Sequence, residues 1–338
     1  MALSMSAAPP AMRDPFGRTI SYLRLSLTDR CNLRCTYCLP EQAVFAPRSS
    51  LLGLDELERV AAAFIRLGVR KLRLTGGEPL VRKGAVDLVE RLGRRLGAGG
   101  LDELTLTTNG LLLEPNAGAL ARAGVRRINV SLDHLDPAAF ARITRGGDVE
   151  RVVAGIDAAL GNGIAVKINA VVLRDDNLDH LPSLVSWAHR RGMAISLIEV
   201  MPIGEIGADR QSQHVPMPRA RALIEQSMPL ADIPLRTGGP ARYARSAEGG
   251  IVGFITPLSA MFCEGCNRVR VGADGLLHAC LGHSTAIDLK PALREHRDDR
   301  ALDSAIAALI RIKPVGHDFA IGPGTRAAVA RPMAATGG

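Results

Sequence analysis

The feature that most constrains the fold is a repeated alternation of short strand-like runs and amphipathic segments along most of the chain. The strand candidates are residues 22–27, 71–75, 103–107, 127–133, 165–173 and 193–201. The amphipathic segments between them are residues 54–67, 84–96, 116–123, 150–160 and 178–190. Strands that recur at intervals of about 30 residues, with a helix between, are typical of repeated βαβ units and a parallel sheet. We therefore expect an α/β fold of six such units.

The predicted strands are polar on one face only. In residues 22–27, Leu23 and Leu25 lie on one face and Arg24 on the other, and the later strands alternate in the same way. The polar face carries four cations and one acid, namely Arg24, Lys71, Arg73, Lys167 and Asp133. Because unpaired buried charges are costly, this face must meet water or an anionic ligand. The pattern favours a partial (βα)6 TIM-type barrel with a polar lumen over an open sheet whose second face is merely solvated.

After Pro202 the alternation stops and the chain becomes rich in Gly and Pro, with helix candidates at residues 219–227 and 299–310. We expect a C-terminal α+β extension packed on the barrel. The predicted division is a flexible tail (1–12), a partial barrel (13–205), a C-terminal region (206–328) and a closing tail (329–338). The first residues, broken by Pro9 and Pro10, do not resemble a secretion signal.

Composition excludes several classes of protein. Hydrophobic residues make up 47% and charged residues 22%, so the chain can bury a large core. No apolar run approaches the ~18 residues of a membrane span, so we expect a cytoplasmic protein with no membrane partner. The low aromatic content of 3% disfavours a base-stacking RNA platform. The net charge of +8 fits either a solvated Arg-rich surface or an anionic ligand.

The six cysteines form two groups of three, which in the absence of a secretion signal indicates metal ligands. Cys31, Cys35 and Cys38 form CxxxCxxC in the loop after the first strand. Three thiolates at this spacing can hold three corners of an iron–sulfur cube and leave its fourth iron open. A zinc site completed by a distant histidine is the alternative.

The second group, Cys263, Cys266 and Cys280, is followed by His283, and this spacing also suits a Cys3His zinc site. His278 and His317 are further candidate ligands. Arg268 and Arg270 come just after Cys266, and alternate residues of an extended segment point the same way. Both guanidinium groups could therefore reach one anion.

These motifs resemble the radical S-adenosylmethionine (SAM) superfamily, which carries CxxxCxxC after the first barrel strand with an aromatic, here Tyr37, before the third cysteine. The segment Thr75-Gly76-Gly77-Glu78-Pro79 is similar to its GGEP motif. Nearly the whole chain further resembles the GTP 3′,8-cyclase family of molybdenum cofactor biosynthesis. The matching segments are YLRLSLTDRCNLRCTYCLPE, LRLTGGEPLVRK, TTNGLLL, RRINVSLDHLD, VKINAVV and FCEGCNRVRVGADGLLHACL.

The resemblance implies two [4Fe–4S] clusters, one on each cysteine group, and SAM as a cofactor. It implies SAM contacts from Tyr37, Gly77, Ser131 and Met201. It implies GTP contacts from Arg24, Arg73, Thr107, Lys167, Arg268, Val269 and Arg270. Among these, Cys31, Cys35, Cys38, Arg268 and Arg270 would take part in catalysis. The terminal Gly337 and Gly338 would reach toward the active site.

The implied reaction converts GTP to 3′,8-cyclo-7,8-dihydro-GTP through a 5′-deoxyadenosyl radical. The implied partners are a low-potential electron donor and a downstream pterin-forming enzyme, with no nucleic acid, and both a monomer and a homodimer remain open. The chain departs from the family at Ser196, where an arginine is usual, and conservatively at Leu39, where a methionine is usual. The alternatives are a radical SAM enzyme for another anionic substrate and a zinc-stabilised nucleic-acid-binding protein.

Overall fold

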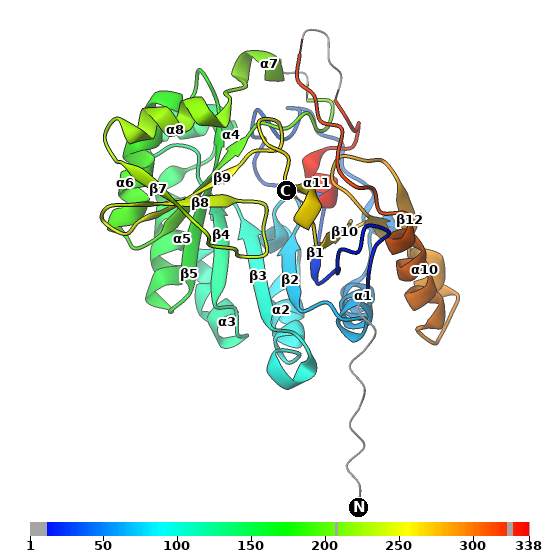
Figure 1. Cartoon of the computed structure of the whole chain (residues 1–338). Helices are drawn as coiled ribbons and strands as arrows, with labels where there is room; N and C mark the ends of the chain where they lie inside the picture. The colour runs from blue at the N-terminus through cyan, green and yellow to red at the C-terminus, as the bar shows by residue number, and fades with distance from the viewer. Residues whose placement is uncertain (1–11, 207–208, 323–326, 338) are drawn as a thin grey trace, which may run out of the picture.

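The structure is a computed structural model that describes residues 12–206, 209–322 and 327–337, so most of the predicted N-terminal tail lies outside it. Six parallel strands form the centre and curve into a partial barrel (Figure 1). They are β1 (Tyr22–Ser26), β2 (Lys71–Thr75), β3 (Glu103–Thr108), β4 (Arg127–Ser131), β5 (Ala165–Val172) and β6 (Ala194–Glu199). The expected partial barrel is confirmed, and all six strands lie where the alternation predicts them.

Helices follow the strands and cover the outside of the barrel (Figure 1). They are α1 (Leu54–Arg66), α2 (Ala85–Gly93), α3 (Ala117–Arg122), α5 (Val149–Gly161) and α6 (Leu181–Arg190). The apolar strand face packs against these helices: Leu23, Leu25 and Ile168 are fully buried in one core. An additional helix, α4 (Pro137–Thr144), was not predicted; Asp136 caps its first turn by accepting a hydrogen bond from the Ala139 amide at 2.8 Å.

The expected C-terminal extension is present, and it extends the same sheet at both edges. At one edge β10 (Arg268–Val271) pairs in parallel with β1 and continues into β11 (Leu276–His278) and β12 (Ala286–Asp288). At the other edge β9 (Ile251–Ile255) pairs in parallel with β6, followed by β8 (Arg242–Ser246) and β7 (Leu230–Ile233). The added strands satisfy the backbone groups that β1 and β6 would otherwise leave open at the edges of the barrel.

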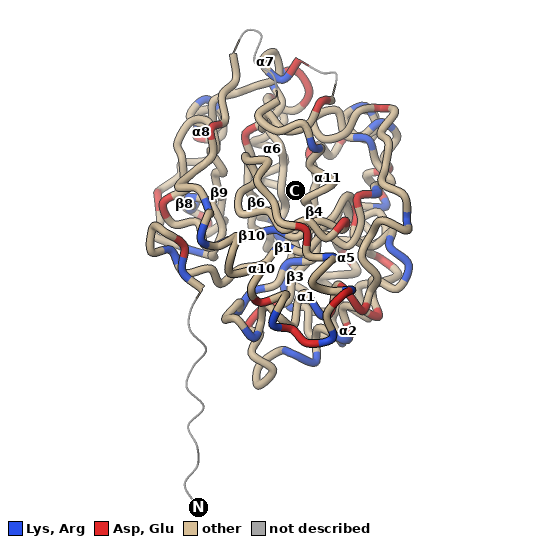
Figure 2. The backbone as a smooth tube through the Cα atoms, turned by 90° about the vertical axis from the view of Figure 1, so that its right-hand side faces the viewer, with Lys and Arg blue, Asp and Glu red and all other residues tan. Residues whose placement is uncertain are grey.

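The remaining helices are α7 (Arg210–Gln213), α8 (Met217–Glu225), α9 (Lys290–Arg294), α10 (Arg300–Arg311) and α11 (Met333–Thr336). The two views agree that α11 lies near the centre of the molecule, where it contacts β1 (Figures 1 and 2). Figure 2 also shows basic and acidic residues intermixed over the outside of the molecule. Within the described ranges, none of the helices combines the length and the apolar character that a bilayer crossing demands.

Candidate active site

The strand register brings the cations of the polar face into adjacent positions. Arg24 of β1 lies opposite Arg270 of β10 on one side and Arg73 of β2 on the other. One step earlier, Tyr22 lies between Arg268 and Lys71. Because β10 pairs in parallel with β1, the two arginines that follow the second cysteine group join the same face as the arginines of the barrel.

The first cysteine group sits in the loop after β1, and the end of β2 holds this loop in place. The amides of Gly77 and Glu78 donate to the carbonyls of Thr28 and Arg30 at 2.8 and 2.9 Å. A Cβ atom on Gly77 would overlap the Arg30 carbonyl, so only glycine permits this approach. Glu78 is fully buried, and its carboxylate accepts from the Asn109 amide at 2.6 Å. The GGEP segment therefore anchors the cysteine loop.

Cys31, Cys35 and Cys38 line a cavity that we call the triad cavity. Its other lining residues include Tyr37, Gly77, Thr107, Ser131 and Met201, so all four predicted SAM contacts surround one space. The Tyr37 hydroxyl donates to Asp133 Oδ2 at 2.8 Å, and Asp133 Oδ1 accepts from the Val171 amide at 2.8 Å. Burial raises the pKa of Asp133 to about 6 despite these two hydrogen bonds. Asp133 thus serves to orient Tyr37.

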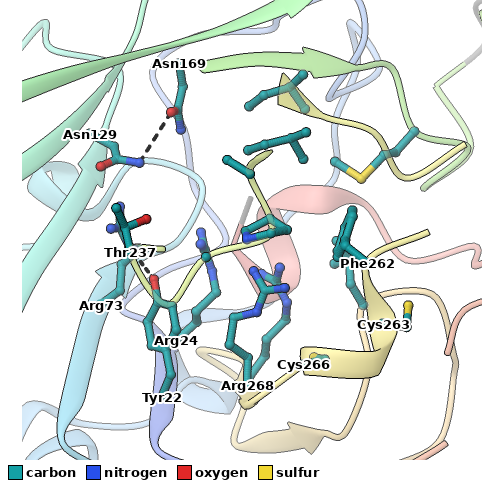
Figure 3. A pocket seen from close by; sticks show the side chains of 18 of the residues that line it. Tyr22, Arg24, Arg73, Asn129, Asn169, Thr237, Phe262, Cys263, Cys266 and Arg268 are labelled. Carbon is teal, nitrogen blue, oxygen red and sulfur yellow. Dashed lines mark hydrogen bonds between the residues drawn. The ribbon is translucent and has the colours of Figure 1, made fainter. Parts of the chain in front are cut away.

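A second cavity, which we call the cationic cavity, adjoins the triad cavity and shares Asn169, Ile198 and Met201 with it. Figure 3 shows the side chains of Arg24, Arg73 and Arg268 gathered in this space, with Cys263 and Cys266 at its margin. Above them the amide group of Asn129 donates to Asn169 at 3.3 Å (Figure 3). The lining also includes Lys71, Lys167, Arg270 and Cys280.

Among the described residues, carboxylates balance only part of the charge of the cationic cavity. Glu103 pairs with Lys71 at 2.7 Å and with Arg127 at 2.5 Å. Within the described part of the chain, no carboxylate forms an ion pair with Arg73, Lys167, Arg268 or Arg270. Burial together with Arg73 and Arg127 lowers the pKa of Lys167 to about 7. Such a cluster favours the binding of an anionic ligand.

Tyr22 lies inside this cluster and was missed as a candidate, although its position two residues before Arg24 places it on the same strand face. Its hydroxyl accepts from Arg73 Nε at 2.6 Å. Burial raises the pKa of Tyr22, but Arg73, Arg24 and Lys71 outweigh burial and lower it to about 7. Arg73 also donates to Thr107 Oγ1 at 3.0 Å, which connects the two cavities.

The second cysteine group faces the cationic cavity from the side of β10. Burial raises the pKa of Cys266, but Arg268 and Lys313 lower it to about 7, so this thiol ionises readily. His283 Nε2 lies 2.7 Å from the Gly316 carbonyl and is engaged there. Among the described residues, no three His, Cys, Asp or Glu side chains converge as a single metal ion requires. Three thiolates that are spread apart fit the corners of an iron–sulfur cube better than they fit a single zinc ion with Cys3His ligands.

Two positions singled out in the sequence, the predicted GTP contact Val269 and the family departure Ser196, have buried side chains. The Val269 side chain is buried in the core, so only its backbone can face a ligand. Ser196 is completely buried, and its hydroxyl has no hydrogen-bond partner in the described structure. It lies opposite Gly253 of β9, where a Cβ would be 2.7 Å from Ser196 Oγ and 2.8 Å from the Tyr243 ring. Tyr243 therefore occupies the space beside Ser196.

Tyr243 and Thr237 belong to the cationic cavity but were not predicted. The Tyr243 hydroxyl lies 2.8 Å from Thr237 Oγ1 and 3.4 Å from Lys167 Nζ. No local pattern identifies Tyr243, because it reaches the cavity only through the pairing of β8 with β9 and of β9 with β6.

The structure is a parallel partial barrel with a three-cysteine loop after its first strand and a GGEP segment after its second. These features together define a radical SAM protein. The Radical SAM superfamily matches residues 25–188, and the Molybdenum Cofactor Synthesis C family matches residues 193–319. GTP 3′,8-cyclases of Rhodopseudomonas palustris and Caulobacter vibrioides are 56% and 55% identical; the alignments cover 99% and 100% of this chain and 99% and 98% of those proteins. The chain belongs to the GTP 3′,8-cyclase family.

The fold is shared with a more distant structure. Streptococcus suis SuiB bound to S-adenosylmethionine aligns with a TM-score of 0.59 at 15% identity, over 84% of this chain and 65% of SuiB. The predictions of a radical SAM enzyme, and of iron–sulfur clusters and SAM as its cofactors, are confirmed at the level of the family.

Proposed function

We propose that this chain converts GTP to 3′,8-cyclo-7,8-dihydro-GTP, the first step of molybdenum cofactor biosynthesis. The observation that carries the proposal is the cationic cavity, which lies between the two cysteine groups and carries more cations than carboxylates can neutralise. A nucleoside triphosphate would supply the missing negative charge, with its base and ribose placed between the two cysteine groups. When bound, the first cluster and SAM would supply the radical chemistry that acts at ribose C3′ of GTP.

The residue roles follow from the two cavities. Cys31, Cys35 and Cys38 would hold the first cluster, with SAM beside Tyr37, Gly77, Ser131 and Met201. Arg24, Arg73, Lys167, Arg268 and Arg270 would bind the triphosphate, so that interactions remote from the reacting carbon orient the ribose. Thr107 lines the triad cavity and accepts from Arg73, so it would contact the nucleotide where the two cavities meet.

The second group, Cys263, Cys266 and Cys280, would hold the second cluster, which would supply a metal site for the purine. The protein thereby fixes base and ribose relative to each other and keeps water away from C3′. A low-potential electron donor and a downstream pterin-forming enzyme complete the proposed setting, in the cytoplasm.

The test is product analysis after anaerobic incubation with SAM, a reductant and each of GTP, ATP and GDP. We expect cyclised product with GTP only, and 5′-deoxyadenosine in a matching amount. Cys35→Ala is the matched control and should form neither product. A cluster that loses one of its three cysteine ligands would no longer be held in place to bind SAM. Normal 5′-deoxyadenosine formation by Cys35→Ala would contradict the assignment of the first cluster.

A further inference from the structure

Lys313 is a buried cation that the proposed reaction does not use. It follows α10, and only 3% of its surface is exposed. Its Nζ donates to the Ala279 carbonyl at 2.6 Å, to the Arg268 carbonyl at 3.0 Å and to Cys266 Sγ at 3.7 Å. These three contacts use all three protons of the ammonium group.

The position of Lys313 links the parts of the second cysteine group. Arg268 follows Cys266 by two residues, and Ala279 directly precedes Cys280. One ammonium group therefore ties together the two segments that supply two of the three ligands, and it also donates to the sulfur of one of them.

The charge of Lys313 has no carboxylate partner within the described residues, and the two carbonyl groups are neutral. Arg18, another cation that holds this region, differs in this respect. It donates to the Cys263 carbonyl at 2.9 Å but is paired with Asp14 at 2.5 Å. A buried charge is costly unless an opposite charge lies nearby. The surroundings of Lys313 therefore favour a negative charge next to Cys266 Sγ.

We propose that Lys313 is a positioning residue that sets the reduction potential of the second iron–sulfur cluster by acting as its buried counter-charge through Cys266. A cube held by three thiolates is anionic, and reduction adds one more negative charge. Net charge and hydrogen bonds to the sulfurs are the main determinants of cluster potential. A fixed ammonium group at hydrogen-bond distance from a ligand sulfur therefore stabilises the reduced form and raises the potential.

This inference rests on the proposed function, because it requires a cluster on the second cysteine group. The experiment uses the full chain with Cys31, Cys35 and Cys38 replaced by Ala, so that the second cluster is observed alone. The measurement is a reduction-potential titration followed by electron paramagnetic resonance, with iron content and circular dichroism recorded for each protein. Absence of iron in this background with Lys313 intact would refute the proposed function rather than the role of Lys313.

Three substitutions separate charge from packing. Lys313→Gln keeps hydrogen-bond donors but removes the charge. Lys313→Met keeps the chain length but removes the charge and the donors. Lys313→Arg keeps the charge and the donors. We expect a more negative potential for Lys313→Gln and Lys313→Met, with Lys313→Arg close to the parent. Lys83→Met is the matched control, because Lys83 is exposed, and it should leave the potential unchanged.

The retention of the cluster and its reduction potential in the three variants test the role of Lys313. Folded Gln and Met variants that lose the cluster while Arg retains it would also support the requirement for charge. An unchanged potential in folded, iron-containing Gln and Met variants would overturn the proposal, and Lys313 would then only hold β10 to the segment before Cys280. Loss of the cluster in all three variants would overturn it equally.

Discussion

Lys167 reaches the cationic cavity from β5, and the surrounding cations control its charge. Burial together with Arg73 and Arg127 holds the pKa of Lys167 near 7 in the absence of ligand. Below that pH the side chain is charged and attracts the triphosphate. Above it the free enzyme loses this charge, so GTP binding must then be accompanied by the uptake of a proton.

We therefore expect the KM for GTP to be flat below pH 7 and to rise by up to about tenfold per pH unit above it. The measurement is initial-rate kinetics from about pH 6 to about pH 9. Lys167→Arg should remove the rise, because arginine keeps its charge throughout this range. Tyr22 also has a pKa near 7 and is tested by Tyr22→Phe. If Tyr22→Phe abolishes the rise and Lys167→Arg does not, Tyr22 is the titrating group.

Arg268 and Arg270 are the residues of β10 that face the cationic cavity. Arg268→Ala and Arg270→Ala should weaken GTP binding more than SAM binding. A charge-assisted contact contributes roughly 1.5–3 kcal/mol, which corresponds to a loss of about ten- to a hundred-fold in affinity. Equilibrium binding of each ligand under anaerobic conditions checks this, and unchanged GTP affinity in both variants would show that these arginines do not contact GTP.

At the scale of the element, those helices and strands that show a clear periodicity of apolar residues could be predicted from the sequence. The six barrel strands and the polar face carrying Arg24, Arg73 and Lys167 follow from alternation alone, because side-chain direction in a strand has a period of two. The pairing of β9 and β10 with the barrel edges joins segments far apart in the chain. Nothing local specifies such pairing, so the sites of Tyr243 and Lys313 could not be predicted.

Gly77 shows how one element positions another, because its backbone lies against the loop that carries the first cysteines. Gly77→Ala should displace this loop and lower the iron content from about eight to about four per chain, with the second cluster retained. Iron analysis and electron paramagnetic resonance measure the effect. Gly161→Ala is the matched control, since a Cβ at Gly161 meets nothing within 4 Å. Full occupancy of the first cluster in Gly77→Ala would contradict this account.

At the scale of the whole molecule, the two chain regions form one continuous sheet, and the last helix, α11, returns to its interior (Figure 1). Thr336 is 1% exposed, and the Gly337 carbonyl accepts a hydrogen bond from Arg270. Gly337 has a φ of +73°, and a Cβ there would overlap the Thr75 side chain. Gly337 is therefore in contact with the cationic cavity through Arg270, whereas Gly338 lies outside the described residues.

Deleting Gly337 and Gly338 should leave both clusters in place but suppress cyclisation. The deletion removes the carbonyl that holds Arg270, and a small displacement of a substrate-binding group lowers the rate by about tenfold or more. Iron content and the magnetic resonance of both clusters should match the parent, while the amount of cyclised product falls. Gly337→Ala preserves the chain length and should reproduce the loss, because its Cβ collides with Thr75. Full turnover by the truncated enzyme would show that Arg270 holds its position without the end of the chain.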